Sequence, residues 1–364
     1  MNTARKNLGV LTAGGDCPGL NAVIRAVSKT AMNDYGMNVI GFRDGFFGLV
    51  KNKSIQLHRD DVSGILTRGG TILGTSNRHN PFRWAEERKG KIIHRNMSRN
   101  AVTTYRRLRL DGLVCIGGEG TMAIAGELIK CGLNVVGVPK TIDNDLAGTD
   151  QTFGFDTAVQ TATEAIDKLH DTAQSHHRVM IVETMGRYAG WLTLAAGIAG
   201  GGDIILLPEI HYDIRKICAV LAARTRFGKR FSIVVVAEGA RPHGGDMVVS
   251  KIDKSSHDPI RLGGIGQFLA RQIEETGGLE TRVTVLGHLQ RGGTPTSYDR
   301  VLCTRYGVFA AHLAGQSCYG NMAALRGTEI VSVPIASIAG KVRTVPLDHP
   351  LIATARSVGT CFGD

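Results

Sequence analysis

The sequence predicts an α/β protein with two doubly wound, parallel-sheet domains of the Rossmann type. Three observations carry this prediction. Short apolar runs alternate with longer segments of helical periodicity along most of the chain. Glycines are abundant, at 47 of 364 residues, and gather beside the apolar runs, as tight strand-to-helix turns require. The units are too many for one compact sheet and too unevenly spaced for an eight-unit barrel.

Seven apolar runs are expected to form the strands. Their aliphatic and β-branched residues follow one another with few polar breaks, which is typical of parallel strands buried on both faces. Ligands of such sheets bind at the carboxyl ends of the strands, so the residues after each run are the first candidates for a site. The expected strands are 8–12, 113–116, 135–138, 179–182, 204–207, 233–236 and 283–286.

Helical segments with apolar residues three or four positions apart separate these strands. The first places Leu20, Val23 and Val27 on one face. A later helix is expected to be capped by Asp156, because a carboxylate can accept hydrogen bonds from the first N–H groups. Beyond about residue 320 no motif is recognisable. The other expected helices are 122–129, 188–198, 213–227, 261–276 and 298–314.

Composition favours an ordinary globular protein with an anionic partner. Hydrophobic residues make up 43% of the chain and charged residues 21%, which excludes intrinsic disorder. The formal net charge of +11 favours nucleic acid, an acidic membrane surface or phosphorylated small molecules. Long basic runs are absent and aromatic residues make up only 5%, so no nucleic-acid partner is expected. The most apolar stretch, 192–207, is broken by glycines and an aspartate, so no membrane association is expected either.

The cysteines and the N-terminus bear on the compartment. Seven cysteines are scattered along the chain without a C-x-x-C pair, so neither a zinc ribbon nor a redox pair is indicated. The first residues lack the apolar run of a signal peptide. Together these features predict a cytoplasmic protein in a reducing environment.

Two glycine-rich turns follow expected strands. Gly14–Gly19 and Gly117–Thr121 each open a helix, where backbone N–H groups make a ready anion site. Glu119 adds a carboxylate inside the second turn, as Mg²⁺ bridging to phosphates requires. A structural turn explains either motif alone, but the repeated arrangement favours phosphate binding. The P-loop and dinucleotide-binding patterns are both absent.

The segment from Lys140 to Asp145 is the most specific in the chain. A turn would explain Asp143, Asn144 and Asp145 by themselves. It does not explain a cation, the Thr141 hydroxyl and two carboxylates at this spacing. Such a set suits a general base with electrostatic support for a migrating anionic group.

Polar residues also flank the later strands. Arg178 and Arg187 bracket one expected strand and are candidate phosphate ligands, because arginine holds phosphates through two parallel hydrogen bonds, although a solvated surface pair explains them equally well. A lone histidine after a strand is more often structural, but His288 lies close to an arginine and a double glycine. The flanking residues are Arg178, Arg187, Glu238, Arg282, His288 and Arg291.

Taken in order, these segments resemble the phosphofructokinase family. The matching segments run from residue 8 to about residue 315 and read GGDCPGLN, GGEGT, PKTIDND, SHHRV, ETMGR, AEG, TRVTVLGHLQRGG and YDR. The resemblance implies phosphoryl transfer to the 1-hydroxyl of fructose 6-phosphate, in a cleft between two doubly wound domains of a homodimer or homotetramer. It also implies a donor domain of residues 1–154 plus about 290–340, and a sugar-phosphate domain of 155–289 plus the C-terminal segment.

The resemblance also implies catalytic roles. Asp143 matches the base that takes the proton from the sugar hydroxyl, and Asp145 matches a second acid that supports the metal or the geometry. Thr141 and Arg187 match groups that steady the transferred phosphoryl group. Glu119 stands where the family usually has an aspartate for Mg²⁺, and the longer acid is still expected to coordinate the ion.

Binding roles follow in the same way, with ATP and Mg²⁺ as the expected ligands beside the sugar phosphate. Arg178 and Arg282 match arginines that reach the 6-phosphate of a neighbouring subunit, so an oligomer is implied. The residues matched to the donor phosphates are Gly15, Arg78, Gly118, Glu119, Gly120 and Thr121. Those matched to the sugar phosphate are Thr141, Ile142, Asp143, Met185, Gly186, Arg187, Glu238, His288, Leu289, Gln290 and Arg291.

The donor is a choice between ATP and pyrophosphate. In the family, glycine at position 120 goes with ATP, because a carboxylate there would collide with the α-phosphate, whereas lysine at position 140 goes with pyrophosphate. This chain has both Gly120 and Lys140. Lys140 adds charge but blocks nothing, so ATP is favoured and a pyrophosphate-dependent enzyme is the alternative. A non-catalytic sugar-phosphate sensor or a nucleic-acid binder is a further alternative, against which the intact Asp143 argues.

Overall fold

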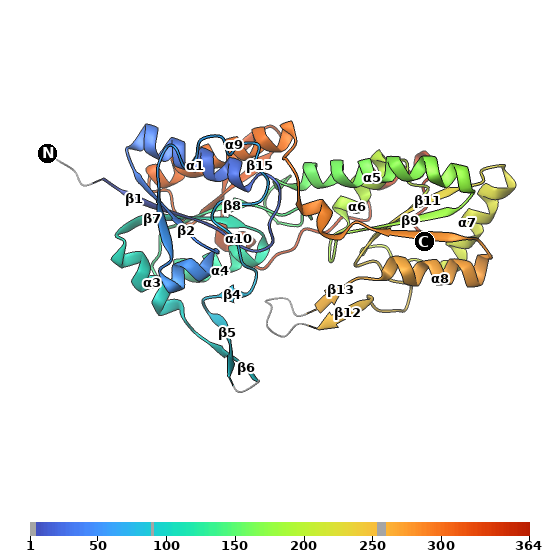
Figure 1. Ribbon diagram of the computed structural model, residues 1–364, viewed down its shortest axis with the longest axis horizontal. Coiled ribbons are helices and arrows are strands. Elements are labelled where there is room, and N and C mark those ends of the chain that lie inside the picture. The colour runs from blue at the N-terminus through green and yellow to red at the C-terminus, as the bar shows by residue number, and fades with distance from the viewer. Residues whose placement is uncertain (1–4, 89–90, 253–259) are drawn as a thin grey trace.

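Two sheets with helices on their faces lie side by side along the long axis of the molecule (Figure 1). The computed structural model describes residues 5–88, 91–252 and 260–364. Within these residues the larger sheet has seven strands and the smaller sheet has four. The predicted α/β class is therefore confirmed.

The larger sheet has the strand order β16-β15-β8-β7-β1-β2-β3. Its five central strands are parallel, and β3 and β16 run antiparallel at the two edges. The antiparallel edges were not predicted; β16 returns from β15 through the short turn at 327–328, which only an antiparallel pair can use. The strands are β1 (Asn7–Thr12), β2 (Asn38–Phe42), β3 (Ser54–Leu57), β7 (Leu110–Gly117), β8 (Val135–Pro139), β15 (Asn321–Arg326) and β16 (Glu329–Pro334).

The smaller sheet has the order β10-β11-β9-β14, and all four strands are parallel. Its strands are β9 (Val179–Thr184), β10 (Ile204–Leu206), β11 (Ser232–Ala237) and β14 (Thr281–Val285). All seven predicted apolar runs thus form strands, three in the larger sheet and four here.

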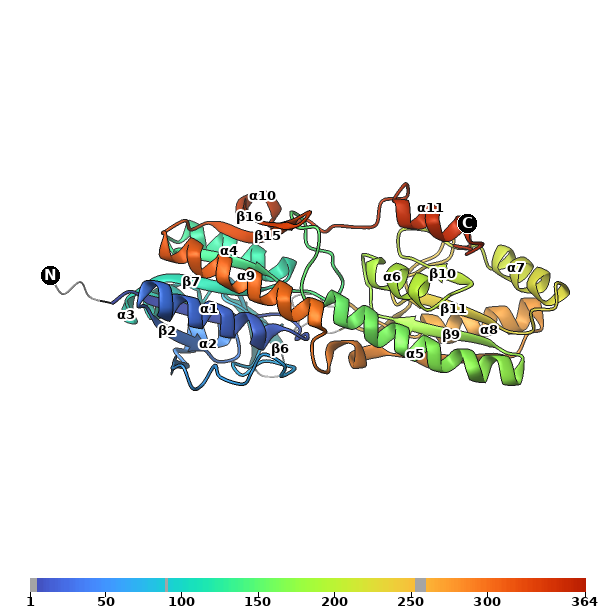
Figure 2. The ribbon, with the colours of Figure 1, turned by 90° about the horizontal axis from the view of Figure 1, so that it is seen from above.

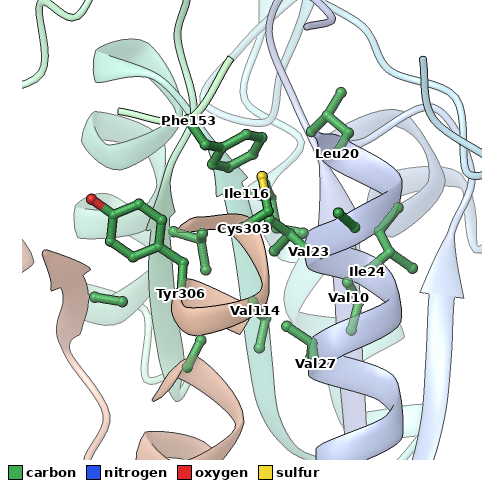
Figure 3. Close-up of a cluster of buried hydrophobic side chains, with 14 of the residues drawn as sticks. Val10, Leu20, Val23, Ile24, Val27, Val114, Ile116, Phe153, Cys303 and Tyr306 are labelled. Carbon is green, nitrogen blue, oxygen red and sulfur yellow. The ribbon is translucent and has the colours of Figure 1, made fainter. Parts of the chain in front are cut away.

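Helices cover both faces of the larger sheet. The side chains of Val10 and Leu11 are both fully buried, but in different core clusters, because successive residues of a strand point to opposite faces. Val10 packs with α1 (Leu20–Tyr35) and α9 (Ser297–Gly315), as Figure 3 shows. Leu11 shares its cluster with residues of four other helices, α2 (Phe46–Lys51), α3 (Ser98–Arg107), α4 (Glu119–Lys130) and α10 (Ile335–Ile338).

The smaller sheet is covered in the same way. Alternate residues of β9 pack against α5 (Phe155–His176) and α6 (Trp191–Ala199) on one face. The intervening residues pack against α7 (Ile214–Arg226) and α8 (Ile265–Gly277) on the other. None of the helices in the described part of the chain is long and apolar enough to cross a membrane.

The start of α5 differs from the prediction. Its N-cap residue is Gly154, and Asp156 lies in the first turn, where it accepts a hydrogen bond from the Thr296 hydroxyl. The N–H groups of Gly154 and Thr157 donate instead to the two carboxylate oxygens of Asp299, over 3.0 and 2.9 Å. The prediction that Asp156 caps this helix is wrong, because a carboxylate from α9 takes the place of a local cap.

Several further elements carried no recognised sequence signal. The segment after residue 320 adds β15 and β16 to the larger sheet and ends in α11 (Pro350–Ser357), which packs on α6. Residues 261–262, predicted as helix, belong to a strand. The remaining elements are β4 (His79–Asn80), β5 (Arg83–Arg88), β6 (Lys91–Arg95), β12 (Val249–Ile252), β13 (Ile260–Leu262) and the 3₁₀ helix η1 (Gly287–Arg291).

Candidate active site

A cavity of about 700 Å³ lies between the carboxyl edges of the two sheets. In the larger sheet the chain passes from β1 to β2 on one side and later returns to β7 on the other side of β1. Ligands of open α/β sheets bind where the strand order reverses in this way. The loops that follow β1 and β7 line the cavity, and residues that follow β9, β11 and β14 face them from the smaller sheet.

Two adjacent glycines, Gly14 and Gly15, shape the loop after β1. Gly14 has φ of 82°, in the left-handed region, and its carbonyl accepts a hydrogen bond of 2.8 Å from the Thr75 hydroxyl. A Cβ on Gly15 would lie 2.0 Å from Nη1 of Arg291, far inside van der Waals contact. The absence of a side chain at Gly15 therefore lets this guanidinium reach the loop.

The loop after β7 opens directly into α4. Gly118 is the N-cap residue, and Glu119, Gly120 and Thr121 form the first helical turn and line the cavity. The first N–H groups of a helix have no partner within the helix, so they form an anion site at this end. Glu119 places a carboxylate at the same end.

The third loop of the larger sheet, after β8, carries two carboxylates. Asp143 and Asp145 both line the cavity, and the N–H of Asp143 donates to the Thr141 hydroxyl over 3.1 Å. Asn144 between them has φ of 51°. Its buried side chain accepts a hydrogen bond of 2.9 Å from the N–H of Thr152, which holds the turn.

The carboxylates have shifted acidities. Burial raises the pKa of Asp143, against the opposing positive charges of Arg291, Lys140 and Arg187. Burial, together with the negative charge of Asp143, raises the pKa of Asp145 to about 7. Oδ1 of Asp143 is buried and has no hydrogen-bond partner within the residues that the structure describes. An acceptor of this kind beside a cavity is suited to receive a proton from a ligand.

Two cations hold the loop after β1. The ammonium group of Lys140, 4% exposed as a residue, donates to the Gly15 carbonyl over 2.5 Å, and burial lowers its pKa. Arg291 donates from Nη1 to the carbonyl of Asp16 over 3.1 Å. Lys140 comes from the larger sheet and Arg291 from the segment after the smaller one, so this loop is held from both sides of the cavity.

The smaller sheet contributes mainly side chains. Met185 and Arg187 follow β9, Glu238 follows β11, and His288 lies in η1 after β14; all four line the cavity. Burial raises the pKa of Glu238 to about 7, and the charge of Asp143 adds to this shift. The Glu238 carboxyl can therefore be neutral or charged near pH 7.

Most of the predicted site residues meet in this cavity. They are Gly15, Gly118, Glu119, Gly120, Thr121, Lys140, Thr141, Asp143, Asp145, Met185, Arg187, Glu238, His288 and Arg291.

Other predicted residues lie beside the cavity without lining it. Ile142 is 2% exposed and belongs to the core, whereas Leu289 is 70% exposed. Gln290 is buried and accepts a hydrogen bond of 3.4 Å from the N–H of Met185, so it supports the loop that also contains Gly186. Arg78 is exposed, between two residues that do line the cavity.

Arg178 and Arg282 lie at the opposite edge of the smaller sheet. They stand at the amino ends of the neighbouring strands β9 and β14, and both pair with Glu280, at 2.9 and 2.5 Å. Strands of this length span about 17–20 Å, so neither arginine reaches the cavity of its own chain.

Sequence reasoning missed several residues that line the cavity. Phe46 of α2, Ile124 of α4 and Val342 after α10 are apolar lining residues, and His79 lines the cavity as well. Burial lowers the pKa of His79, whose Nδ1 lies 2.7 Å from the Ser76 hydroxyl. These residues come from elements far apart in the chain, and no local motif marks them.

The cavity suits a cation that arrives with a polyphosphate. Within residues 5–88, 91–252 and 260–364, no three histidine, cysteine or acidic side chains are close enough to hold a metal ion by themselves. Mg²⁺ is commonly bound by one or two carboxylates together with substrate phosphates and water. Glu119, Asp143 and Asp145 offer carboxylate oxygens of this kind along the cavity.

The chain also matches known proteins over most of its length. Residues 7–314 match the family model described as phosphofructokinase. Over 99% of its length the chain is 54% identical to an "ATP-dependent 6-phosphofructokinase" of Spirochaeta thermophila, of which 98% is covered. It is 49% identical to a "Pyrophosphate--fructose 6-phosphate 1-phosphotransferase" of Streptomyces coelicolor, covering 98% of this chain and 99% of the other.

A solved structure agrees with these matches. The phosphofructokinase of Pichia pastoris in its T-state superimposes with a TM-score of 0.78 at 31% identity, over 93% of this chain and 38% of that longer chain. The shared motifs, the cavity between two α/β units and the full-length similarity all lead to one conclusion. This chain belongs to the phosphofructokinase family.

Proposed function

We propose that this protein transfers the terminal phosphoryl group of ATP–Mg²⁺ to the 1-hydroxyl of D-fructose 6-phosphate, forming fructose 1,6-bisphosphate and ADP. The observation that supports this most directly is the Asp143 carboxylate. Its Oδ1 is buried and has no hydrogen-bond partner among the described residues, and Asp143 lines the same cavity as the glycine loops of one sheet and the charged side chains of the other.

Asp143 acts as the general base. It accepts the proton of the sugar hydroxyl while that oxygen forms a bond to the terminal phosphorus and the bond from phosphorus to the bridging oxygen of ADP breaks. Its raised pKa makes it a better proton acceptor than an ordinary aspartate. Arg187 and the Thr141 hydroxyl stabilise the charge on the transferred group, and Asp145 supports this geometry.

The larger sheet holds the donor. Gly15 and the helix N-terminus at Gly118–Thr121 bind its phosphates, with Arg78 at the exposed rim. Glu119 is the residue proposed to hold Mg²⁺, which neutralises phosphate charge when bound.

The other side of the cavity holds the sugar phosphate. Met185, Gly186, Glu238, His288 and Arg291 are the proposed contacts, with Ile142, Leu289 and Gln290 shaping the adjoining turns. Arg178 and Arg282 would bind the 6-phosphate in a neighbouring subunit, because their edge of the sheet faces away from the cavity of their own chain. The enzyme is therefore proposed to work as a homodimer or homotetramer.

The apolar residues that line the cavity favour ATP as donor. Phe46, Ile124 and Val342 offer surface that a nucleotide base can cover, whereas pyrophosphate has no apolar part to place there. Gly120 adds no carboxylate beside the phosphates. Lys140 and the pyrophosphate-named relative favour the alternative donor, but the ammonium of Lys140 is already bonded to Gly15.

The proposed compartment is the cytoplasm. All seven cysteines are free thiols, as a reducing environment maintains them.

Donor choice is tested by measuring fructose 1,6-bisphosphate formation with ATP and with pyrophosphate as separate donors. We expect turnover with ATP alone, and we expect Gly120→Asp to abolish it through repulsion of the donor phosphates. Gly126→Asp is the matched control, because Gly126 lies on the same helix outside the cavity lining.

Three results would change the proposal. Turnover with pyrophosphate alone would establish the other donor. Unchanged ATP use in Gly120→Asp would refute the steric argument. Binding of fructose 6-phosphate without turnover from either donor would support a sensor.

A further inference from the structure

The C-terminal segment crosses from one half of the molecule to the other. Residues 339–349, here named the strap, run from α10 beside the larger sheet to α11 beside the smaller one, as Figure 2 shows from above. Val342 of the strap lines the cavity. The strap therefore passes the site at the seam between the two halves.

The strap is hydrogen bonded to the loop that carries Asp143. The N–H of Arg343 donates to the carbonyl of Asp145 over 2.7 Å, and Val342 forms an antiparallel bridge with Leu146. The guanidinium of Arg343 donates from Nη1 to the carbonyls of Asp150, over 2.8 Å, and Asn144, over 3.4 Å. These contacts hold residues within 144–150, the segment that comes directly after Asp143 in the chain.

The backbone conformation of the loop that follows Asp143 explains why this loop needs support. Asn144, with φ of 51°, is in the left-handed region that residues other than glycine adopt at some cost. Strained backbone of this kind persists where surrounding contacts hold it. Arg343 contacts the carbonyl of this same residue.

The other side of Arg343 faces the smaller sheet. Its guanidinium carbon lies 4.3 Å from the ring centroid of Trp191, and the Trp191 indole N–H donates to the Arg343 carbonyl over 3.0 Å. Two residues on, the N–H of Val345 donates over 2.7 Å to Glu209, whose Oε1 also accepts from the N–H of Gly190. Gly190 and Trp191 begin α6, directly after the loop of Met185 and Arg187.

We propose that Arg343 is a positioning residue, which holds the Asp143 loop of the larger sheet in register with the Met185–Arg187 loop of the smaller one. Arg343 is not among the residues that line the cavity, so it acts through the loop and not on the substrate. Its catalytic consequence rests on the proposed function, while the positioning itself is a property of the fold.

Steady-state kinetics of Arg343→Met test the catalytic consequence. We expect kcat to fall about 10–100-fold, because small misplacements of reacting groups cost about this much, while KM for fructose 6-phosphate changes by less than about threefold. Arg343→Lys, which can still reach one carbonyl, should recover part of the lost kcat. Arg305→Met is the matched control: Arg305 also donates to a backbone carbonyl, that of Thr328, but is exposed and outside the cavity lining, and should leave kcat unchanged.

Hydrogen exchange tests the positioning without turnover. Arg343→Met should speed exchange of amides in 143–150 by about tenfold or more, with core strands unchanged, because local opening exposes only this loop. If the wild type turns over no donor, the proposed function fails, and this measurement still decides the role of Arg343.

Two results would overturn the inference. One is a kcat of Arg343→Met within twofold of the wild type with unchanged loop exchange. The other is a rise in KM as large as the fall in kcat, which would assign Arg343 to substrate binding. Should Arg343→Met fail to fold, Trp191→Phe replaces it; this variant keeps the ring but loses the indole N–H bond, and a smaller fall in kcat at constant KM is expected.

Discussion

The two sides of the cavity are built from different chemistry. Besides its carboxylates, the larger sheet presents backbone in the glycine loop after β1 and at the first turn of α4, whereas the smaller sheet presents mainly side chains, among them Arg187, Glu238 and His288. Backbone N–H groups bind any phosphate that reaches them, because they recognise the anion and not the shape of the rest of the ligand. Charged side chains recognise one arrangement of hydroxyls and phosphates. This difference is consistent with the proposed placement of the polyphosphate on the first side and the sugar on the second.

The two sides are not independent. Arg291 crosses the cavity to the loop after β1, and the Asp143 carboxylate lies where both sides meet. Four predictions test this comparison, from the largest expected effect to the smallest.

Asp143→Asn should remove catalysis while leaving the binding residues on both sides of the cavity intact. The proposed base acts only in the transition state, so we expect kcat to fall about 10²–10⁴-fold with little change in KM for fructose 6-phosphate. Asp150→Asn, in the same segment but exposed, is the control and should retain activity. A large rise in KM with kcat intact would make Asp143 a binding residue.

Arg282→Ala should act on a site that its own chain does not contain. Loss of a charge-assisted hydrogen bond to phosphate is expected to raise KM for fructose 6-phosphate about 10–100-fold, with kcat largely retained. The exposed Arg215, paired with Asp213, supplies the control variant Arg215→Ala.

Co-expression of Asp143→Asn with Arg282→Ala distinguishes active sites that two subunits share from active sites that one chain forms by itself. If the sites are shared, a mixed oligomer contains one site with both native residues, and low-KM activity returns. Failure of the mixture to recover would show that Arg282 serves no neighbouring subunit.

Gly15→Ala, on the donor side of the cavity, should weaken binding of the sugar phosphate on the other side. The added Cβ displaces the mobile end of Arg291, so we expect KM for fructose 6-phosphate to rise about 5–10-fold, more than KM for ATP. Arg291→Ala should have a similar effect, and the double variant should be no worse than either single one, because both remove the same contact. Additive effects would show that Gly15 acts on the donor alone.

Protonation of Asp145 and Glu238 should appear in the stability of the protein. Their folded pKa values, about 7, exceed the ordinary values of 3.8 and 4.5, so the folded chain binds more protons than the unfolded chain between about pH 4 and pH 7. Their stabilising contribution is therefore complete below pH 4 and lost as the pH rises through 7.

The Tm of a variant with both Asp145→Asn and Glu238→Gln should fall less than that of the wild type between pH 5.5 and pH 8, and should be a few degrees higher at pH 8. Thermal unfolding across this range measures it, with Asp213→Asn, whose carboxylate has a lowered pKa, as the control. Parallel curves for the double variant and the wild type would contradict the raised pKa values.

Sequence reasoning succeeded where the chemistry is local. The apolar runs became strands, and the residues after them meet in the cavity, because parallel strands bring their carboxyl ends to one edge. Reasoning failed where partners are distant. Asp156 has the right residue type for a cap at α5, yet Asp299 from α9 occupies that position. Nothing in the local sequence distinguishes these two aspartates.

The sequence by itself determined the α/β class, the glycine turns and the loop of Asp143, since hydrophobic periodicity and turn chemistry act over a few residues. Only the tertiary structure decided that Phe46, Ile124 and Val342 line one cavity and that Arg343 joins its two sides. Those contacts depend on how separate elements pack. Packing is set by the whole core, which no single segment of the sequence records.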